Sequence, residues 1–449
     1  MRRFATTFFL SLFLASIAVS AAGQMPTTMP TLNSLQGTGT LPPSTTTTFT
    51  FIVAGDNRPA SAGDSPTAVV SQIFTDIANM TTKPAFVLWT GDTIYGKDPS
   101  NRAPIDQEYA AFLNVAKTGG VPVYNAPGNH EMDDSENCPN SSMLSWYLAD
   151  MPMGSENYAF GSFNYGNSHF VALNSDDGGG SPGSCDCKEQ PEGDKPPGFI
   201  SKKQRELLED DLKNNTSAAH VFIFLHRPLK GYKSKHELCE RITEDLEKKF
   251  KKFSNLSYVV AGHEHMYYYP KGDDHFSAPP QRTDPGGKPT YLVAGGAGAP
   301  LEDTKDAFYH YLIFSVNGNT VNVQLVVVAS GSFSSATSSQ DVTLANLAGA
   351  GTAVSAGAST SAPLTCATYP VITFTVQRSS GAQTLGTITT NQGSSWSNYS
   401  LSPNSLLTSD EVQAQITTAG SNCTNEPIGV TFDYIPSPAT NPRPAGDKD

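Results

Sequence analysis

Basic residues are scarce in this chain. Its 449 residues include 29 Lys and Arg against 42 Asp and Glu, which gives a formal net charge of −13 at pH 7. This balance argues against the basic surface that nucleic-acid binding requires, so no nucleic-acid partner is expected. Long apolar runs are also missing beyond Val19. No membrane span is therefore expected once the N-terminal segment has been removed.

That N-terminal segment has the layout of a secretory signal peptide. Arg2 and Arg3 precede an apolar run that extends to Val19, and small residues follow at 20–23. We therefore expect a signal peptide over 1–23, and a protein that is secreted or periplasmic. An uncleaved membrane anchor is the alternative, although the apolar run is short for a span.

Cysteine is also sparse, with six residues in the chain. An even number in an exported chain favours disulfides. Cys366 and Cys423 stand alone in the C-terminal part, so we expect a bond between them. The remaining cysteines are expected to staple loops around the candidate site: Cys138, Cys185, Cys187 and Cys239.

Composition divides the rest of the chain into segments. Residues 24–48 are rich in Thr, Pro and Ser and are expected to form a flexible leader. The candidate catalytic domain spans 49–328. We expect a Ser/Ala/Gly-rich linker over 329–363, a small β-rich module over 364–435 and a disordered tail over 436–449. The module carries no chemical motif, so it is a candidate for binding a surface or partner, or for stabilising the chain.

Within the candidate catalytic domain, strand and helix patterns alternate. Their order is strand 49–54, helix 69–77, strand 86–89, helix 107–117 and strand 121–125. Later strands are expected at 220–225, 259–261, 290–294, 309–316 and 321–328. This alternation predicts a mostly parallel sheet, in which ligands bind at the carboxyl ends of the strands.

Polar residues follow the ends of these strands. The strand that ends at Ala261 runs into Gly262, where the backbone can turn so that His263 and His265 leave the strand end together. Earlier strand ends supply further candidate metal ligands: Asp56, Asp92, Tyr95, Asn129 and His226. Carboxylate, amide, imidazole and phenolate groups are ligands for di- or trivalent cations. Two metals about 3.5–4 Å apart can clamp a phosphate and generate hydroxide at mild pH.

Each of these residues also has an ordinary structural alternative. Asp92 and Asn129 could be turn residues, and His226 a buried core histidine. Glu131 could be a loop carboxylate that positions His130. These alternatives would have to coincide at five strand ends, so we interpret the residues jointly as a metal centre. Other histidines match no motif and are interpreted as structural or surface residues: His169, His220, His236, His275 and His310.

Five motifs in 49–328 resemble the calcineurin-like metallophosphoesterase superfamily. They are Gly55-Asp56-x-Arg58, Gly91-Asp92-x-x-Tyr95, Gly128-Asn129-His130-Glu131, His226 and Gly262-His263-x-His265. The resemblance implies an α/β fold in which two packed sheets are flanked by helices, an α/β/β/α sandwich. It does not extend to the C-terminal part, which we expect to be a small all-β module. It also implies a dinuclear centre with Asp92 as the bridging ligand. The implied ligands of the first metal are Asp56 and His265, and those of the second are Asn129, His226 and His263.

The first motif departs from the superfamily's commonest pattern. Where that pattern has a ligating histidine, this chain has Arg58, and a guanidinium cannot ligate a metal. Tyr95 follows Asp92 by three residues, which is similar to the purple acid phosphatases, where a tyrosinate binds a ferric ion. The alternative is that Tyr95 only packs and that water completes the first metal's coordination. Since Arg58 is not a ligand, it is free to face phosphate oxygens. The resemblance also implies that His130 contacts the phosphate or protonates the leaving oxygen.

The expected function is an exported, acid phosphatase-like hydrolase of phosphate monoesters that uses a metal-bound hydroxide. The expected cofactors are two metal ions: iron paired with zinc, with manganese or with a second iron. The expected substrate is a phosphorylated small molecule or a nucleotide. One alternative is a phosphodiesterase or nucleotidase of the same superfamily. Another is a degenerate, non-catalytic surface-binding protein. Residues 267–269, three tyrosines, could line a leaving-group pocket or pack in the core.

Overall fold

The computed structural model describes most of the chain. The described residues are 26–42, 46–133, 139–151, 159–177, 198–233, 236–270, 279, 281–283, 288–302, 307–347, 350–424 and 427–437. The expected signal peptide, most of the expected tail, His275 and three cysteines (Cys138, Cys185 and Cys187) lie outside these residues.

Six helices lie in the described part of the chain. They are α1 (Ala68–Asn79), α2 (Arg102–Thr118), α3 (Asn129–Met132), α4 (Ser141–Asp150), α5 (Lys202–Asn214) and α6 (Glu240–Phe250). Helix α1 forms because Val70, Ile73 and Ile77 recur on one face, which is fully buried. Helix α4 was not expected from the sequence. It begins where the Asn140 side chain accepts hydrogen bonds from the first backbone N–H groups of the helix.

The strands form three sheets. The largest has the order β16 (Gly393–Asn398), β13 (Gly351–Leu364), β19 (Ile428–Pro436), β11 (Thr320–Phe333), β10 (His310–Asn317), β1 (Thr48–Ala54), β2 (Val87–Trp89) and β3 (Val123–Asn125), with β17 (Ser405–Leu406) on β13. The second is β4 (Gly161–Tyr165), β5 (Ser168–Ala172), β6 (His220–Phe224), β7 (Leu256–Ala261), β9 (Thr290–Ala294) and β8 (Tyr267–Tyr268). The third is β12 (Asp341–Asn346), β18 (Glu411–Thr418), β14 (Val371–Gln377) and β15 (Gln383–Thr389).

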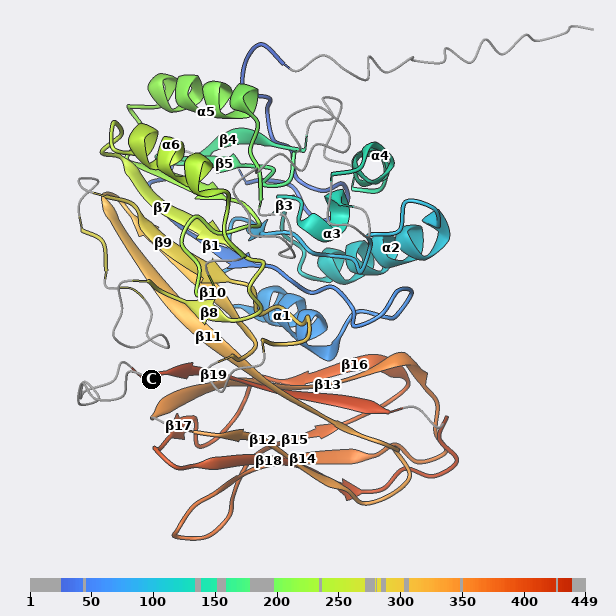
Figure 1. The fold of residues 1–449 in the computed structure, drawn as a ribbon. Coiled ribbons are helices and arrows are strands. Elements are labelled where there is room, and N and C mark those ends of the chain that lie inside the picture. Colours follow the sequence, from blue (N-terminus) through green and yellow to red (C-terminus); the bar gives the residue numbers. More distant parts are fainter. Residues whose placement is uncertain are drawn as a thin grey trace, which may run out of the picture.

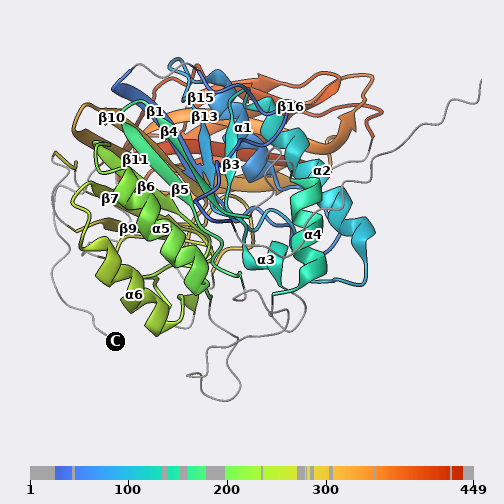
Figure 2. The same cartoon turned by 90° about the horizontal axis from the view of Figure 1, so that it is seen from above.

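The predicted α/β/β/α sandwich is confirmed. Strands β1, β2 and β3 pair in parallel in the largest sheet, as do β5, β6, β7 and β9 in the second. The two sheets pack face to face, with α5 and α6 on the outer face of one and α1 and α2 on the other (Figures 1 and 2). The carboxyl ends of both parallel sets therefore reach the same end of the sandwich.

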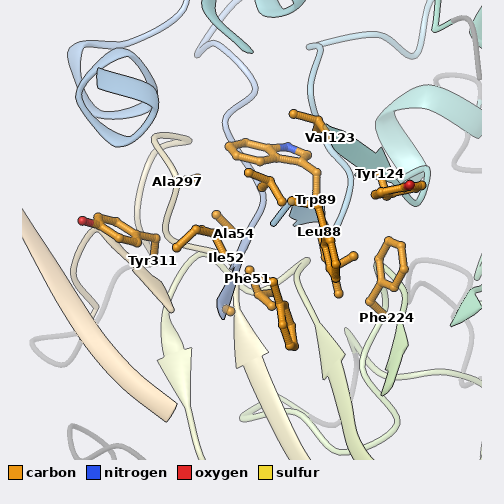
Figure 3. Close-up of a cluster of buried hydrophobic side chains, with 14 of the residues drawn as sticks. Phe51, Ile52, Ala54, Leu88, Trp89, Val123, Tyr124, Phe224, Ala297 and Tyr311 are labelled. Carbon is orange, nitrogen blue, oxygen red and sulfur yellow. The ribbon is translucent and has the colours of Figure 1, made fainter. Parts of the chain in front are cut away.

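Aromatic rings fill the space between the two sheets. Phe51 of β1 stacks on Phe314 of β10, with ring centroids 4.9 Å apart, and meets Phe222 of β6 edge-on at 5.1 Å. Figure 3 shows Phe51 in this cluster, with Trp89 from β2 above it. Each such ring contributes about 1.5–3 kcal/mol of hydrophobic stabilisation when it is fully buried. This core holds the strand ends in fixed positions.

The strands of the C-terminal region continue the largest sheet, the one that contains β1, β2 and β3. The long strand β11 pairs with β10 through residues 320–327 and with β19 through residues 327–333. Strands β13, β16, β17 and β19 thus extend the largest sheet, and the third sheet packs against them around a separate apolar core (Figure 1). The region is a β-sandwich, hereafter the C-terminal sandwich, that shares one sheet with the catalytic domain.

The expected linker over 329–363 was wrong. Its residues form the end of β11, β12 and most of β13. Small residues predominate there because neighbouring elements approach closely. A Cβ atom at Gly357 would lie 1.8 Å from Oε1 of Gln72 in α1, and one at Gly331 would lie 2.9 Å from Val342. Small side chains hide the period-2 pattern of a strand, which is why composition alone suggested a linker.

The expected flexible leader over 24–48 was also wrong for much of its described part. Leu32 and Leu35 are buried in the catalytic core. The backbone N–H of Leu35 donates to the carbonyl of Val123 in β3 at 2.8 Å, and Thr31 forms a bridge to Ser162 of β4. Thr- and Pro-rich composition therefore conceals a segment that is anchored by two apolar side chains.

The predicted Cys366–Cys423 disulfide is present, with an S–S distance of 2.05 Å. Cys239 is also disulfide-bonded. Among the described helices, none is long and apolar enough to cross a bilayer.

Candidate metal centre

The loops that follow β1, β2 and β7 interlock at the end of the sandwich. Asp56, Asp92 and His263 have positive φ angles of 63°, 52° and 71°. Such a backbone costs about 1–3 kcal/mol per non-glycine residue and persists only where surrounding contacts fix it. Here the N–H of Asp56 donates to the Gly91 carbonyl at 2.9 Å, and the N–H of His263 donates to the Asp56 carboxylate at 2.9 Å. The strained positions therefore coincide with predicted ligands.

Two groups of potential ligand atoms share one carboxylate. Asp92, His226 and His263 offer atoms that all lie within 4.8 Å of one another, and so do Asp56, Asp92 and His265. Asp92 belongs to both groups, which is the position that the sequence predicted for the bridging ligand. Asn129 joins the first group, because its Oδ1 lies 3.0 Å from Nε2 of His226.

The His226 ring presents a lone pair to other lone pairs. Its Nδ1 lies 2.8 Å from the Thr90 carbonyl, so Nδ1 carries the hydrogen and Nε2 is the acceptor. Nε2 then faces Oδ1 of Asp92 at 3.2 Å, Oδ1 of Asn129 at 3.0 Å and Nδ1 of His263 at 3.0 Å. A hydrogen on His263 could satisfy one of these contacts, but the oxygen atoms would still face the lone pair. A cation satisfies all of them.

The His265 ring is arranged in the same way. Its Nδ1 donates to the Pro300 carbonyl at 2.5 Å, which leaves Nε2 facing Oδ1 of Asp56 at 3.6 Å. Fixing one ring nitrogen through a backbone carbonyl and offering the other to a metal is the usual arrangement around metal-bound histidines. Thr90 and Pro300 had no recognisable signal in the sequence, because they act through their backbone.

Burial supports the same interpretation. It lowers the pKa of His226, His263 and His265, so all three imidazoles are neutral and able to ligate. Burial and the charge of Asp92 raise the pKa of Asp56 well above its usual range, which is the cost of two adjacent buried carboxyls without a cation. The donor set of carboxylate, amide oxygen and neutral imidazole fits two divalent or trivalent cations.

Glu131 holds the loops after β2 and β3 together. Its buried carboxylate accepts hydrogen bonds from the backbone N–H groups of Asp92 at 2.9 Å, Thr93 at 2.6 Å and Gly128 at 2.6 Å. It also accepts from the Thr93 hydroxyl at 2.8 Å and the Ile94 N–H at 3.2 Å. Glu131 is therefore a structural carboxylate that positions Asp92, the predicted bridging ligand, which is a wider role than positioning His130.

Arg58 and His130 both lie beside Asp92. The Arg58 Nε atom is 3.9 Å from Oδ2 of Asp92, and the Arg58 side chain is 19% exposed. The His130 Nε2 atom is 3.8 Å from the same oxygen, while its Nδ1 donates to the Tyr95 carbonyl. The two predicted phosphate-contacting residues thus approach the bridging carboxylate from its partly open side.

Tyr95 lies next to these residues and is partly exposed. Its ring packs edge-on against His130, with centroids 5.9 Å apart, and its N–H donates to Glu108 at 2.6 Å. The following residue must be glycine, because a Cβ at Gly96 would lie 1.9 Å from the His130 carbonyl oxygen. Ligation of a metal by Tyr95 stays a prediction.

Two nearby residues were missed by the sequence analysis. The His236 ring lies 5.1 Å from the ring of His263, so its interpretation as a structural or surface residue is corrected to one beside the centre. Arg227 is buried and donates to Asp176 at 2.6 Å and to Asp133 at 3.4 Å, and its Nη1 lies 3.3 Å from Nε2 of His263. The available signal for Arg227 and Asp176 was their position in the loops that follow the strands β6 and β5.

The three consecutive tyrosines separate into different roles. Tyr267 is fully buried and packs edge-on against His310, so it belongs to the core. Tyr268 meets the ring of Tyr232 at 5.6 Å, and Tyr232 is 43% exposed. This aromatic pair is anchored near the centre because the N–H of Tyr232 donates to Glu264, which lies between the candidate ligands His263 and His265 in the sequence.

Residues 49–267 match the family model of calcineurin-like phosphoesterases. This part of the chain is a calcineurin-like phosphoesterase domain. The matched span contains every predicted metal ligand, from Asp56 to His265, together with Arg58 and His130. The phosphoesterase domain thus brings to one point the residues that the sequence motifs had singled out.

Several solved structures are similar to the chain at low identity. A dimetal phosphatase from Danio rerio is 17% identical, covers 64% of this chain and 96% of its own, and has a TM-score of 0.42. GAP50, the anchor in the inner membrane complex of Plasmodium, is 12% identical over 63% of this chain and 85% of its own, with a TM-score of 0.39. Zn²⁺-complexed Vps29 from Entamoeba histolytica is 14% identical over 62% of this chain and 92% of its own, with a TM-score of 0.28. No curated protein matches the chain.

Proposed function

We propose that the chain is an exported, dinuclear-metal phosphatase that hydrolyses phosphate monoesters. The observation that carries this proposal is the pair of ligand groups that share Asp92, in which His226 and His265 turn their Nε2 lone pairs toward carboxylate oxygens. Two cations held there would supply Lewis-acid activation of water and of phosphate oxygens. Asp56 and His265 would hold the first cation, and Asn129, His226 and His263 the second.

The charges around the centre support a monoester substrate. Arg58 and Lys97 both place positive charge beside Asp92 and His130. A phosphate monoester is a dianion near neutral pH, whereas a diester is a monoanion. Each fixed positive charge therefore attracts the monoester about twice as strongly by Coulomb's law. Arg58 is the residue that we assign to the phosphate oxygens, as a bidentate donor.

His130 is the residue that we assign to proton transfer. Its Nδ1 hydrogen is held by the Tyr95 carbonyl, so Nε2 is the atom that faces the centre. Burial lowers the pKa of His130 to about 3, and the ring is neutral in the free protein. A phosphate dianion bound beside Nε2 would favour the protonated ring. His130 would then hold at Nε2 the proton that the leaving oxygen takes.

The purple acid phosphatase-like branch rests on Tyr95. With iron bound, a tyrosinate ligand would give a broad visible absorption band. We expect this band in the purified holoprotein and its loss in Tyr95→Phe, with metal content retained. A colourless protein containing two zinc or manganese ions would leave the phosphatase proposal intact and remove Tyr95 from the ligand set.

Hydrolysis assays on the holoprotein test the function itself. Para-nitrophenyl phosphate, bis(para-nitrophenyl) phosphate and a 5′-nucleotide separate monoesterase, diesterase and nucleotidase activity. We expect the aryl monoester to have the highest kcat/KM, and Arg58→Ala to weaken inhibition by inorganic phosphate. Full occupancy by two metals without hydrolysis of any of the three would reject the enzyme and favour a surface-binding protein.

The disulfides support export. The Cys366–Cys423 bond and the bonded Cys239 are typical of proteins that fold in an oxidising compartment. We expect expression of the full chain in a secretion-competent host to release a protein whose N-terminus begins after residues 21–23. Recovery of an intact N-terminus in the cytosol would contradict this part of the proposal.

A further inference from the structure

Two buried carboxyl groups meet where the C-terminal sandwich packs on the catalytic domain. Asp76 comes from α1, Asp433 from β19, and Ser355 stands directly opposite Asp433 on β13. The exposed fractions are 1% for Asp76 and 0% for the other two residues. Within the described residues, neither carboxyl group forms an ion pair with Lys, Arg or His. Two charges without a counter-ion would be costly here.

The geometry around Ser355 requires a proton on one of the carboxyls. The Ser355 Oγ atom lies 2.9 Å from Oδ1 of Asp76 and 2.6 Å from Oδ2 of Asp433. A hydroxyl carries one hydrogen and can donate to only one of the two oxygens. The other contact is a hydrogen bond only if that carboxyl is protonated and donates to Oγ.

Asp76 has the environment of an ionised carboxylate. Its Oδ1 accepts from Nε2 of Gln72 at 2.7 Å and from the Tyr399 hydroxyl at 2.9 Å, and its Oδ2 accepts from the Tyr311 hydroxyl at 3.2 Å. Asp433, in contrast, has one oxygen, Oδ1, for which the described structure contains no hydrogen-bond partner. The proton is therefore assigned to Oδ2 of Asp433, which donates to Ser355, which in turn donates to Asp76.

The directions of the pKa shifts of these groups agree with this assignment. Burial and the negative charge of Asp76 raise the pKa of Asp433 well above its usual range. Burial also raises the pKa of Asp76, but hydrogen bonds from Ser355 and Tyr399 oppose that rise. Burial raises the pKa of Tyr311 and Tyr399, so both phenols that face the pair stay neutral.

We propose that the Asp433–Ser355–Asp76 chain is a pH-sensitive lock, which holds the C-terminal sandwich on α1 while Asp433 keeps its proton and loosens when that proton is lost. In the locked state, one proton leaves a single negative charge that four donors surround. In the unlocked state, two buried carboxylates repel each other, and Ser355 can satisfy only one of them. The lock lies outside the metal centre and does not depend on the proposed reaction.

The lock contacts both parts of the molecule and has a path to solvent. Gln72 and Asp76 belong to α1, and Tyr311 belongs to β10 of the catalytic sheet, whereas Tyr399 follows β16 in the sandwich. A cavity of about 260 Å³ borders Asp76 and is also lined by Tyr311, Tyr399, Val354 and Asn79 among others. Asn79 is exposed, so a proton that passes from Asp433 through Ser355 to Asp76 can exchange with water through this cavity.

The sign of the pH effect follows from proton linkage. The native state binds a proton on Asp433 at pH values where the unfolded chain has already released it. The contribution of Asp433 to the stability is therefore largest at acidic pH and falls as the pH rises from the unfolded value of about 3.8 toward the raised native pKa. The lock thus favours a closed molecule under acidic conditions.

Asp433→Asn tests the lock in the full-length holoprotein. The amide of Asn can donate to Ser355 at every pH, as the protonated carboxyl does, so the variant should stay locked. We expect the Tm of the wild type to fall between pH 5 and pH 9 and that of Asp433→Asn to fall less, by a few degrees. The protection factors of amides in α1, β13 and β19, which correct for the intrinsic rise of exchange with pH, should fall at pH 9 in the wild type only. Asp341→Asn, an exposed aspartate of the same sandwich, is the control and should follow the wild type.

A second measurement covers the case in which the variant fails to fold. The infrared carbonyl stretch of a buried protonated carboxylic acid should be present in the wild type at pH 5 and lost at high pH, without any substitution of Asp433. Ser355→Ala should lower the protection factors of these elements already at pH 5, because the relay is broken at every pH. Equal loss of Tm in the wild type and Asp433→Asn, or no protonated-acid signal at pH 5, would overturn the proposal.

Discussion

The Nε2 atom of His226 lies 3.2 Å from Oδ1 of Asp92, and the other nitrogen of the ring is held by the Thr90 carbonyl. An unprotonated nitrogen that faces a carboxylate is repulsive unless a cation lies between them. Asp92 also belongs to a second group of potential ligands, in which the Nε2 atom of His265 faces the carboxylate of Asp56. The centre is therefore organised around one carboxylate that two cations would share.

Asp92→Asn should remove both metals. An amide offers one weak oxygen ligand where the carboxylate offered two charged ones, and both groups depend on it. We expect less than one metal per chain by elemental analysis and a fall in kcat of about 10³-fold or more, since the metals supply several kcal/mol of charge stabilisation. Asp210→Asn is the control, because that exposed carboxylate contacts only Lys213 among the described residues. Two retained metals in Asp92→Asn would exclude a bridging role.

Single histidine substitutions should separate the two metal positions. His265→Ala removes a ligand that only the group with Asp56 uses, and His263→Ala removes one that only the group with His226 uses. We expect each variant to retain one metal, and the two retained metals to differ in affinity in a chelator titration. If either variant lost both metals while remaining folded by circular dichroism, the two positions would not be independent.

Glu131→Gln should destabilise the loops that carry the ligands. The carboxylate accepts hydrogen bonds from four backbone N–H groups and one hydroxyl, and an amide would turn a donor toward some of them. We expect the free energy of unfolding to fall by about 3 kcal/mol, measured by denaturant titration.

Metal affinity should fall in Glu131→Gln as well, because Asp92 loses the hydrogen bond that fixes its backbone. The matched control is Glu206→Gln, whose carboxylate is exposed and pairs with Lys202 one helical turn away. It should change stability by no more than about 0.5 kcal/mol. Equal stability of the two variants would show that Glu131 is not a structural carboxylate.

Replacing Cys366 and Cys423 together by serine should destabilise the C-terminal sandwich. The disulfide closes a loop with a sequence separation of 57 residues, for which the chain-entropy relation gives about 4 kcal/mol. Because the sandwich shares a sheet with the catalytic domain, we expect one cooperative transition at lower denaturant concentration. A separate early transition, with the metal centre unaffected, would instead show that the two parts unfold independently.

The candidate ligands that the structure brings together could be predicted because short motifs carried them. Asp56, Asp92, Asn129, His226, His263 and His265 each follow an apolar strand, and parallel strands of a sandwich end on one side. The fold class followed from the same alternation of strands and helices. Apolar periodicity is local, so the sequence displays it directly.

The shape of the C-terminal part could not be predicted. Residues 351–364 form a long strand of small side chains, because Gln72 of α1 lies against Gly357 and leaves no room for larger ones. The requirement comes from a helix nearly 300 positions earlier, and composition alone resembled a linker. The contact of Ser355 with Asp76 could not be predicted either, because the two residues are similarly far apart in the sequence.

The sequence by itself determined which residues can ligate a metal, which strands carry them and which cysteines pair in the C-terminal part. Only the tertiary structure decided which nitrogen of each histidine is free, because the Thr90 and Pro300 carbonyls that fix the rings belong to other loops. It also decided that His236 and Arg227 lie beside the centre and that the C-terminal sandwich continues the catalytic sheet. Motifs depend on neighbours in the chain, whereas protonation and packing depend on neighbours in space.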